Sequence, residues 1–318
     1  MLISNCLIHP ILTSTLQGAS VLMQEFAPHM ECLQMTILSL EASHSTSQSC
    51  PCGNVNTIYR CINCFHSPVF CSACIVTTHV LNPFHRLEKW TGTHFSRIPL
   101  GDLGGVIHLG HGGQRCPNIL PTSGRRMTVV HTTGIHTLFT TFCGCLGAPA
   151  DLLQLTGARL FPATVNRPDT ALTFAFLEDL HIHVLTSKKS VFDHHSAIQR
   201  LTNAVSPQNV PNRYPECNQV LQLWQTLSLA RRAGQAHGID AQFPNRIPKS
   251  LAVRCFACPD IGFNIEKRVV DAASEAESHK YSLFLSIDGN FRLQRTHTNK
   301  RRDADDVALI DGHGYFVN

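Results

Sequence analysis

The chain has 318 residues, of which 43% are hydrophobic and 15% are charged, and its formal net charge is +4. This length and hydrophobic content predict two domains with real cores and exclude a disordered tail. The mild positive charge permits a nucleic-acid partner without requiring one, and no apolar run of about 18 residues supports a membrane span. The 14 cysteines and 19 histidines favour metal binding.

Residues 1–47 are predicted to hold one amphipathic helix and a polar linker. After Pro28 the apolar residues recur at spacings of three and four, which indicates a helix that we expect to pack on the module that follows. The first residues, MLISNCLIHP, lack a basic segment, and Pro10 interrupts their apolar run. We therefore expect a protein of the nucleus or cytoplasm that is not secreted, where disulfides are disfavoured.

Residues 48–116 are predicted to form a zinc-binding cysteine cluster. Eight candidate ligands fall into four close pairs: Cys50 and Cys52, Cys61 and Cys64, Cys71 and Cys74, His79 and His85. Since a structural zinc ion takes four sulfur or nitrogen ligands, these pairs predict two ions. The chain order suggests an interleaved arrangement, in which the first pair shares an ion with the third and the second with the fourth. Disulfides and unbound thiols are the alternatives.

Residues 117–150 are predicted to be a β-rich connector, with a loop at 117–127 and two strands in TVVHTTGIHTLFTTFCGCL. Cys143 and Cys145 form a further close pair, which cannot complete a zinc site alone. Its candidate partners are Cys116, His136, and the distant pair Cys255 and Cys258. His111, in a glycine-rich turn before Cys116, is one more candidate ligand. A third zinc ion and metal-free thiol pairs both remain open.

From residue 151 onward, helices are predicted at Thr170–Leu180, at Ser190–Leu201 and from Tyr214 to the arginines before Gly234. We interpret Asp193, His194 and His195 as structural, because neighbours on a helix point to different faces. The β-prone run KYSLFLSIDGNFRLQRT then places Asp288 at a strand end. Such a carboxylate can coordinate Mg²⁺, whereas an Asp-Gly pair also favours a hairpin turn, so the residues alone leave its role open.

A series of phrases in a fixed order resembles the KDZ (Kyakuja, Dileera, Zisupton) transposases of fungi from about Gln24 onward. The phrases are PFHRLEKWTG, LGHGGQRCP, LFPATVNRPDTALTF, NRYPE, LAVRCFACP and SIDGNFRLQR. The resemblance implies an N-terminal CxC-type cysteine cluster, with residues 151–318 as the first part of a DDE-type transposase domain of ribonuclease H-like fold. It also implies that Asp288 is the first catalytic carboxylate.

In this family the other catalytic carboxylates lie well downstream of the first one. The acidic residues that follow here lie in a loop-like polar segment and are expected to be solvated: Asp303, Asp305, Asp306 and Asp311. We therefore expect an incomplete catalytic centre, with Mg²⁺ relevant only to a complete one.

These features predict an α+β protein, in which a small zinc-stapled module precedes a mixed helical and β region and the first strands of a truncated ribonuclease H-like domain. The expected function is that of a transposase-derived zinc protein that binds DNA with weak sequence preference. The alternatives are an active transposase subunit completed by another chain, and a B-box or RING-like scaffold for a protein partner or a homo-oligomer. The cations expected to meet phosphates are Arg60, Arg86, Lys89, Arg97, Arg292, Arg295, Lys300, Arg301 and Arg302.

Overall fold

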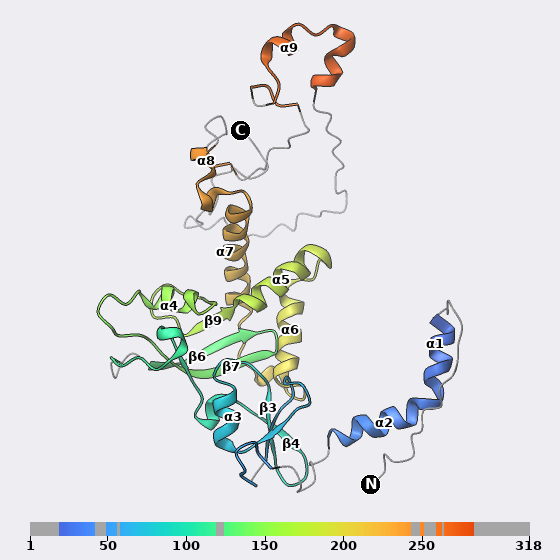
Figure 1. Ribbon diagram of the computed structural model, residues 1–318, viewed down its shortest axis with the longest axis vertical. Coiled ribbons are helices and arrows are strands. Elements are labelled where there is room, and N and C mark those ends of the chain that lie inside the picture. Colours follow the sequence, from blue (N-terminus) through green and yellow to red (C-terminus); the bar gives the residue numbers. More distant parts are fainter. Residues whose placement is uncertain are drawn as a thin grey trace, which may run out of the picture. The chain divides into compact units, whose positions relative to one another are not determined.

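The computed structural model describes residues 19–41, 49–55, 58–118, 124–242, 249–250, 259–262 and 264–282 (Figure 1). The chain divides into two compact units, Met1–Cys217 and Asn218–Asn318. Cys255, Cys258, Asp288 and the predicted basic tail lie outside the described residues.

The first unit begins with two helices, α1 (Ala19–Phe26) and α2 (Met30–Ser39), joined by a 3-10 turn that contains Pro28. The helix predicted after Pro28 is confirmed. Its expected packing on the zinc module is not seen, because α2 buries none of its residues and Met30 and Ile37 are more than half exposed. Residue 40 still connects the two parts, since its backbone carbonyl accepts a hydrogen bond from Arg60.

A four-stranded antiparallel sheet follows, with the strand order β2-β1-β3-β4. Its strands are β1 (Tyr59–Cys61), β2 (Val69–Phe70), β3 (Leu87–Trp90) and β4 (Phe95–Ile98). Helix α3 (Ser72–Thr78) packs on this sheet through Ile75, which is fully buried beside Leu87. The same core includes several cysteines and Leu138 from the next sheet, so the two sheets share one apolar cluster.

The second sheet has five strands in the order β5-β7-β6-β9-β8. They are β5 (Val106–His108), β6 (Gly124–His131), β7 (Gly134–Thr141), β8 (Leu160–Pro162) and β9 (Thr170–Thr173). The hairpin of β6 and β7 confirms the two predicted strands, although β6 already begins at Gly124, inside the predicted loop, because it pairs there with Thr141. β5 adds to β7 and β9 adds to β6, both in parallel.

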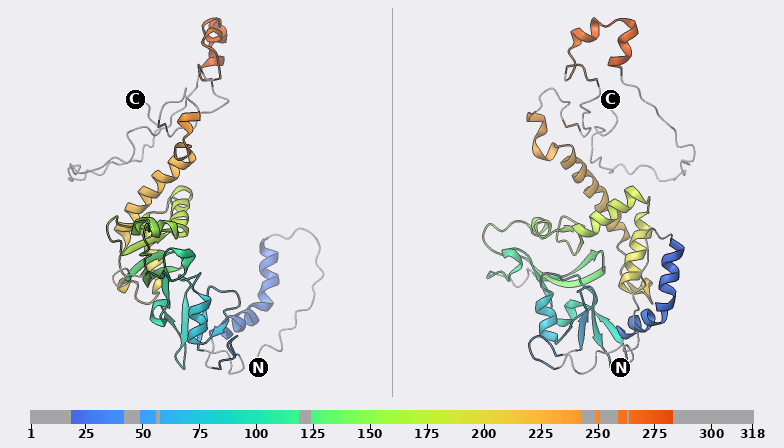
Figure 2. Two further views of the ribbon diagram at one scale, coloured as in Figure 1. Left: turned by 60° about the vertical axis from the view of Figure 1, so that its left-hand side comes forward. Right: turned by 45° about the vertical axis from the view of Figure 1, so that its right-hand side comes forward.

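Three helices accompany this sheet: α4 (Asp151–Gly157), α5 (Phe174–Thr186) and α6 (Val191–Thr202). The helix predicted from Thr170 is wrong in its first turn, because Thr170–Thr173 forms β9 against β6. Helix α5 starts afterwards, where the Thr173 hydroxyl accepts a hydrogen bond from the backbone N–H of Phe176. The helix predicted at Ser190–Leu201 is confirmed as α6, which Ser190 caps in the same way and which packs against β7 (Figure 2).

Helix α7 (Tyr214–Arg232) runs into the second unit and confirms its prediction, with Gly234 in the left-handed conformation just beyond its end. The second unit also contains α8 (Ile239–Gln242), α9 (Lys267–Asp271) and a 3-10 helix at Glu275–Tyr281. Within the described ranges no helix has the length and apolar character needed to cross a bilayer. The mixture of helices and sheets confirms the α+β class.

Candidate metal centres

Three groups of cysteines and histidines bring four ligand atoms to within 4.8 Å of one another. The first is Cys50, Cys52, Cys71 and Cys74; the second is Cys61, Cys64, His79 and His85; the third is His111, Cys116, Cys143 and Cys145. The first two are grouped as the chain order suggested. Among the described residues, these are the groups of three or more such side chains whose ligand atoms already lie within 4.8 Å of one another.

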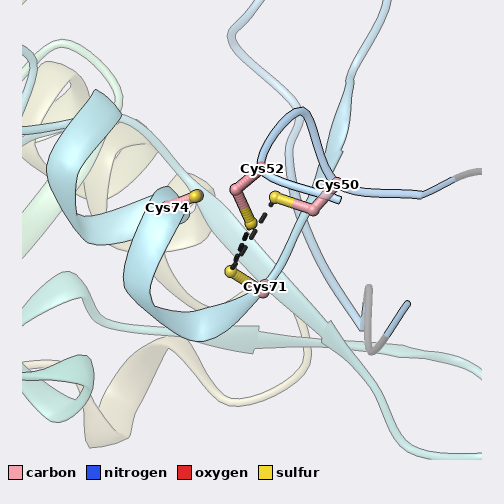
Figure 3. A group of neighbouring side chains, drawn as sticks. All are labelled: Cys50, Cys52, Cys71 and Cys74. Carbon is pink, nitrogen blue, oxygen red and sulfur yellow. Dashed lines mark hydrogen bonds between the residues drawn. The ribbon is translucent and has the colours of Figure 1, made fainter. Parts of the chain in front are cut away.

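The first group joins a turn to the start of a helix. The turn that carries Cys50 and Cys52 is closed by a hydrogen bond from the Gly53 N–H to the Cys50 carbonyl, while Cys71 is the N-cap of α3 and Cys74 lies in its first turn. The Cys71 sulfur lies 3.8 Å from both Cys50 and Cys52 (Figure 3). Zinc with Zn–S bonds of about 2.3 Å gives a tetrahedron whose S···S edges are about 3.8 Å. A disulfide would need about 2.05 Å, so these spacings match a tetrathiolate metal site and not a disulfide.

The second group uses the other end of the same helix. Cys61 ends β1, Cys64 follows in the next turn, His79 is the C-cap of α3, and His85 precedes β3. The Cys64 sulfur lies 3.5 Å from both His79 Nε2 and His85 Nδ1. The corresponding S···N edge of a tetrahedral zinc site is about 3.6 Å.

A hydrogen bond outside the group fixes the orientation of one ligand. The Nδ1–H of His79 donates to the Ile75 carbonyl over 2.8 Å, because a carbonyl can only accept. The acceptor nitrogen Nε2 is then left facing the two thiols, which is the arrangement that metal-binding histidines use.

The protonation states in the first two groups favour a bound cation. Burial lowers the pKa of both His79 and His85, so their neutral, metal-binding forms prevail at pH 7. The pKa of Cys50 falls to about 6 because the backbone of Cys52 donates to its sulfur. Burial raises the pKa of Cys61 to about 11, and hydrogen bonds among neighbouring thiols raise that of Cys74 to about 12. Several thiolates crowded together therefore need a metal ion to stay deprotonated.

The third group lies at one edge of the five-stranded sheet. Cys143 and Cys145 follow the end of β7, and the Cys116 sulfur lies 3.7 Å from each of them. Nε2 of His111 lies 3.2 Å from the Cys143 sulfur and 3.5 Å from that of Cys145. These distances again match the edges of a zinc tetrahedron.

The proposal that His136 belongs to this group is wrong. His136 lies within β7, where its Nε2 is 2.9 Å from the Thr133 hydroxyl and its ring is 5.7 Å from that of Phe84. Desolvation lowers its pKa to about 3, so it stays neutral without a metal. It cannot reach Cys143 and Cys145, because they lie beyond the far end of its strand.

A buried amide holds the third group in place. Gln154 of α4 accepts a hydrogen bond from the Cys143 N–H at 2.8 Å and donates to the carbonyls of Cys143 (3.1 Å) and Pro149 (2.8 Å). Both the carbonyl and the NH₂ group of this side chain therefore bond to the backbone of the segment from Cys143 to Pro149 and hold it in place. The sequence contains no signal for this role, because a single glutamine in a short helix has no characteristic spacing.

Two of the cations predicted to meet DNA have internal roles instead. Arg60 is 8% exposed, pairs with Glu88 at 2.7 Å and lies 3.6 Å over the ring of Phe95. Arg97 donates to backbone carbonyls at the end of α6. Lys89 is exposed, and Arg86 is partly buried beside Asn63.

The Asp193, His194 and His195 triplet does not converge on one point, as the structural interpretation predicted. Asp193 receives a hydrogen bond from Ser190 at the start of α6, and His195 Nε2 accepts one from the Arg213 N–H. His194 faces Asp179 of α5 instead.

The comparisons with known proteins relate this chain to a transposon family. Residues 100–206 match the family model described as a CxC2 like cysteine cluster associated with KDZ transposases. Over this range, about a third of the chain, the match supports the resemblance to KDZ transposase-related proteins. The matched range contains all of the third group and begins after His85, the last ligand of the second. No curated protein and no solved structure matches the chain.

Proposed function

We propose that this is a transposase-derived zinc-binding protein in which three structural zinc ions hold the first unit together. The supporting observation is the set of three four-ligand groups, each with the spacing of a zinc tetrahedron. Thiolate and imidazole ligands favour zinc over Mg²⁺ or Ca²⁺, which prefer oxygen. Because each group already supplies four protein ligands, no position is left open for a substrate, and the ions are structural.

Native mass spectrometry of the full-length protein tests this proposal. We expect three zinc ions per chain, and one fewer in each of Cys52→Ser, Cys64→Ser and Cys145→Ser. Cys217→Ala is the matched control, because Cys217 is a free cysteine outside the three groups and should leave all three ions bound. Metal-free wild-type protein, or loss of the same ion in every variant, would contradict the proposal.

Duplex DNA is the partner that we propose for the first unit. The support is the relation to transposases, the net charge of +4 and a set of exposed cations: Lys89, Arg115, Arg126, Arg167, Lys188 and Arg200. Since Arg60 and Arg97 are engaged inside the protein, phosphate contacts would come from these exposed side chains. Binding through phosphates releases counterions, so it should be weak in sequence preference and sensitive to salt.

Fluorescence anisotropy with a labelled duplex of about one to three helical turns measures this binding. The logarithm of the binding constant should fall linearly with the logarithm of the salt concentration, with a slope of about one for each phosphate contacted. The combined change Lys89→Gln, Arg115→Gln and Arg126→Gln should reduce that slope, whereas His66→Gln, a control at another exposed position, should not. Undetectable binding at low salt would refute DNA as the partner.

A protein scaffold is the second candidate, favoured by apolar side chains exposed beside the ligands. Phe65, next to Cys64, is 87% exposed, and Leu81, between His79 and His85, is 82% exposed. Exposed apolar groups of this size are typical of interaction surfaces when they cluster. If a second copy of the chain is the partner, sedimentation should show concentration-dependent association that Phe65→Ser weakens; a monomer at all concentrations would exclude self-association.

A further inference from the structure

A histidine whose ring nitrogens form no hydrogen bond in the described part of the chain is buried between α5 and α6. His194 is 4% exposed, and neither of its ring nitrogens has a hydrogen-bond partner among the described residues. A neutral imidazole carries one N–H donor and one acceptor nitrogen, and both are normally satisfied when buried. A buried polar group without a partner needs an explanation, and an ion is one of the few available.

Two further ligand-type side chains approach His194 from α5. Asp179 and His183 lie four residues apart on that helix and so share one face. One carboxylate oxygen of Asp179 is 3.2 Å from His194 Nε2, and the other is 3.7 Å from His183 Nε2. The carboxylate therefore lies between the two imidazoles.

The contact between Asp179 and His194 has the geometry of ligands that share an ion. It is short, yet the oxygen lies outside the direction in which the ring could form a hydrogen bond. Around a tetrahedral zinc ion with bonds of about 2.0–2.1 Å, neighbouring N and O ligands lie about 3.3–3.4 Å apart. The lone pair of each ligand atom points at the metal ion. The neighbouring ligand atom therefore lies off the direction of that lone pair.

We propose that Asp179, His183 and His194 form a divalent transition-metal site that joins α5 to α6, with Zn²⁺ as the best-matched ion. Two imidazoles and one carboxylate are zinc ligands, and three protein ligands leave a fourth position for water. The His183 ring is 5.5 Å from that of His194, and the three ligand atoms do not yet converge as those of the cysteine groups do, so His183, whose side chain is 43% exposed, must rotate to complete the site. The Ser187 hydroxyl lies 3.4 Å from the other nitrogen of His183 and can orient the ring.

Cobalt(II) titration of the full-length protein, with zinc bound at the three cysteine groups and the site between α5 and α6 left empty, tests this proposal. We expect one added cobalt ion per chain whose absorption lacks the intense thiolate-to-cobalt bands that binding at the three cysteine groups would give. Asp179→Asn and His183→Gln should each weaken this binding at least tenfold. Glu178→Gln is the matched control, because it removes the neighbouring carboxylate of α5, which faces Arg159, and should leave binding unchanged.

A second measurement covers the case in which a variant alters folding. Added Zn²⁺ should raise the melting temperature of the wild type and of Glu178→Gln, but not that of Asp179→Asn, whose substitution is isosteric and on a half-exposed side chain. No added metal ion in the wild type, or added binding that survives in Asp179→Asn, would overturn the proposal. Neither result bears on the three cysteine groups, because none of their ligands belongs to this site.

Discussion

Gln154 shows how one buried side chain can decide whether a metal group forms. Its amide satisfies one N–H and two carbonyls of the segment that carries Cys143. Each of these backbone groups would cost about 1–3 kcal/mol if left buried without a partner. The turn between Cys143 and Cys145 thus depends on α4 as much as on its own residues.

We predict that Gln154→Met, which keeps the length of the side chain but removes its hydrogen bonds, weakens the third zinc site by about 10- to 100-fold. Competition with a chromogenic chelator measures this loss, and the other two ions should be released as in the wild type. Gln114→Met, at an exposed glutamine, is the control. Equal weakening of all three sites would mean that Gln154 supports the fold in general and not this group.

Helix α3 explains why the first two groups are interleaved. Its N-terminal end carries Cys71 and Cys74 and its C-terminal end carries His79, so one short helix supplies ligands to both. A seven-residue helix is marginal in water by itself, and two bound ions would fix both of its ends.

Helix α6 depends in a similar way on β4. Arg97 of β4 donates to the carbonyls of Leu201 and Thr202 in the last turn of α6, where the helix has unpaired carbonyls and a partial negative charge. Gly134 makes this approach possible, because a Cβ there would lie 2.9 Å from the Thr202 hydroxyl and 3.1 Å from the Arg97 side chain.

Arg97→Met is therefore predicted to destabilise the zinc-loaded protein by about 1–3 kcal/mol, since its charged hydrogen bonds to the last carbonyls of α6 are lost while much of the packing is kept. Urea unfolding followed by circular dichroism would measure the change. Lys89→Met, at an exposed position of β3, should shift the midpoint far less. A similar shift in both variants would refute the capping role of Arg97.

The two sheets of the first unit are connected beside the second metal group. The Thr133 hydroxyl, in the turn between β6 and β7, donates to the Phe84 carbonyl over 2.5 Å, and Phe84 immediately precedes the ligand His85. Leu138 of β7 lies in the same apolar cluster as the cysteines of the four-stranded sheet. The segment that carries the second group is thus joined to the five-stranded sheet by a hydrogen bond and by shared apolar packing.

Removing zinc is therefore predicted to affect more than residues 50–85. Structural zinc contributes about 10–16 kcal/mol of apparent binding energy, which is comparable with the whole stability of a domain. Hydrogen exchange after chelation should show loss of protection in β1 to β4, and also in the β6–β7 turn and the last turn of α6. Helix α7 beyond Cys217 lies in the second unit and should keep its protection. A loss of protection confined to residues 50–85 would contradict this coupling between the second metal group and the five-stranded sheet.

Local patterns in the sequence were enough to predict the features whose chemistry is local. Pairs of cysteines one or two residues apart can bind one ion from a single turn, so the first eight candidate ligands could be named and grouped from their order, and the structure places them in the same grouping. The hairpin of β6 and β7 and the helix α6, both predicted, likewise depend on neighbouring residues. The match over residues 100–206 supports the family resemblance for the two phrases that lie in this range, LGHGGQRCP and LFPATVNRPDTALTF.

Features that depend on distant contacts were decided only by the tertiary structure. His111, and not His136, joins Cys143 and Cys145, because β7 holds His136 beside Phe84 while the loop after β5 brings His111 to the strand end. Thr170–Thr173 forms a strand because β6 offers it a parallel partner, although its local pattern also suits a helix. Arg60 and Arg97 are engaged inside the protein for the same reason, since Glu88 and the end of α6 are brought to them by folding and not by proximity in the chain.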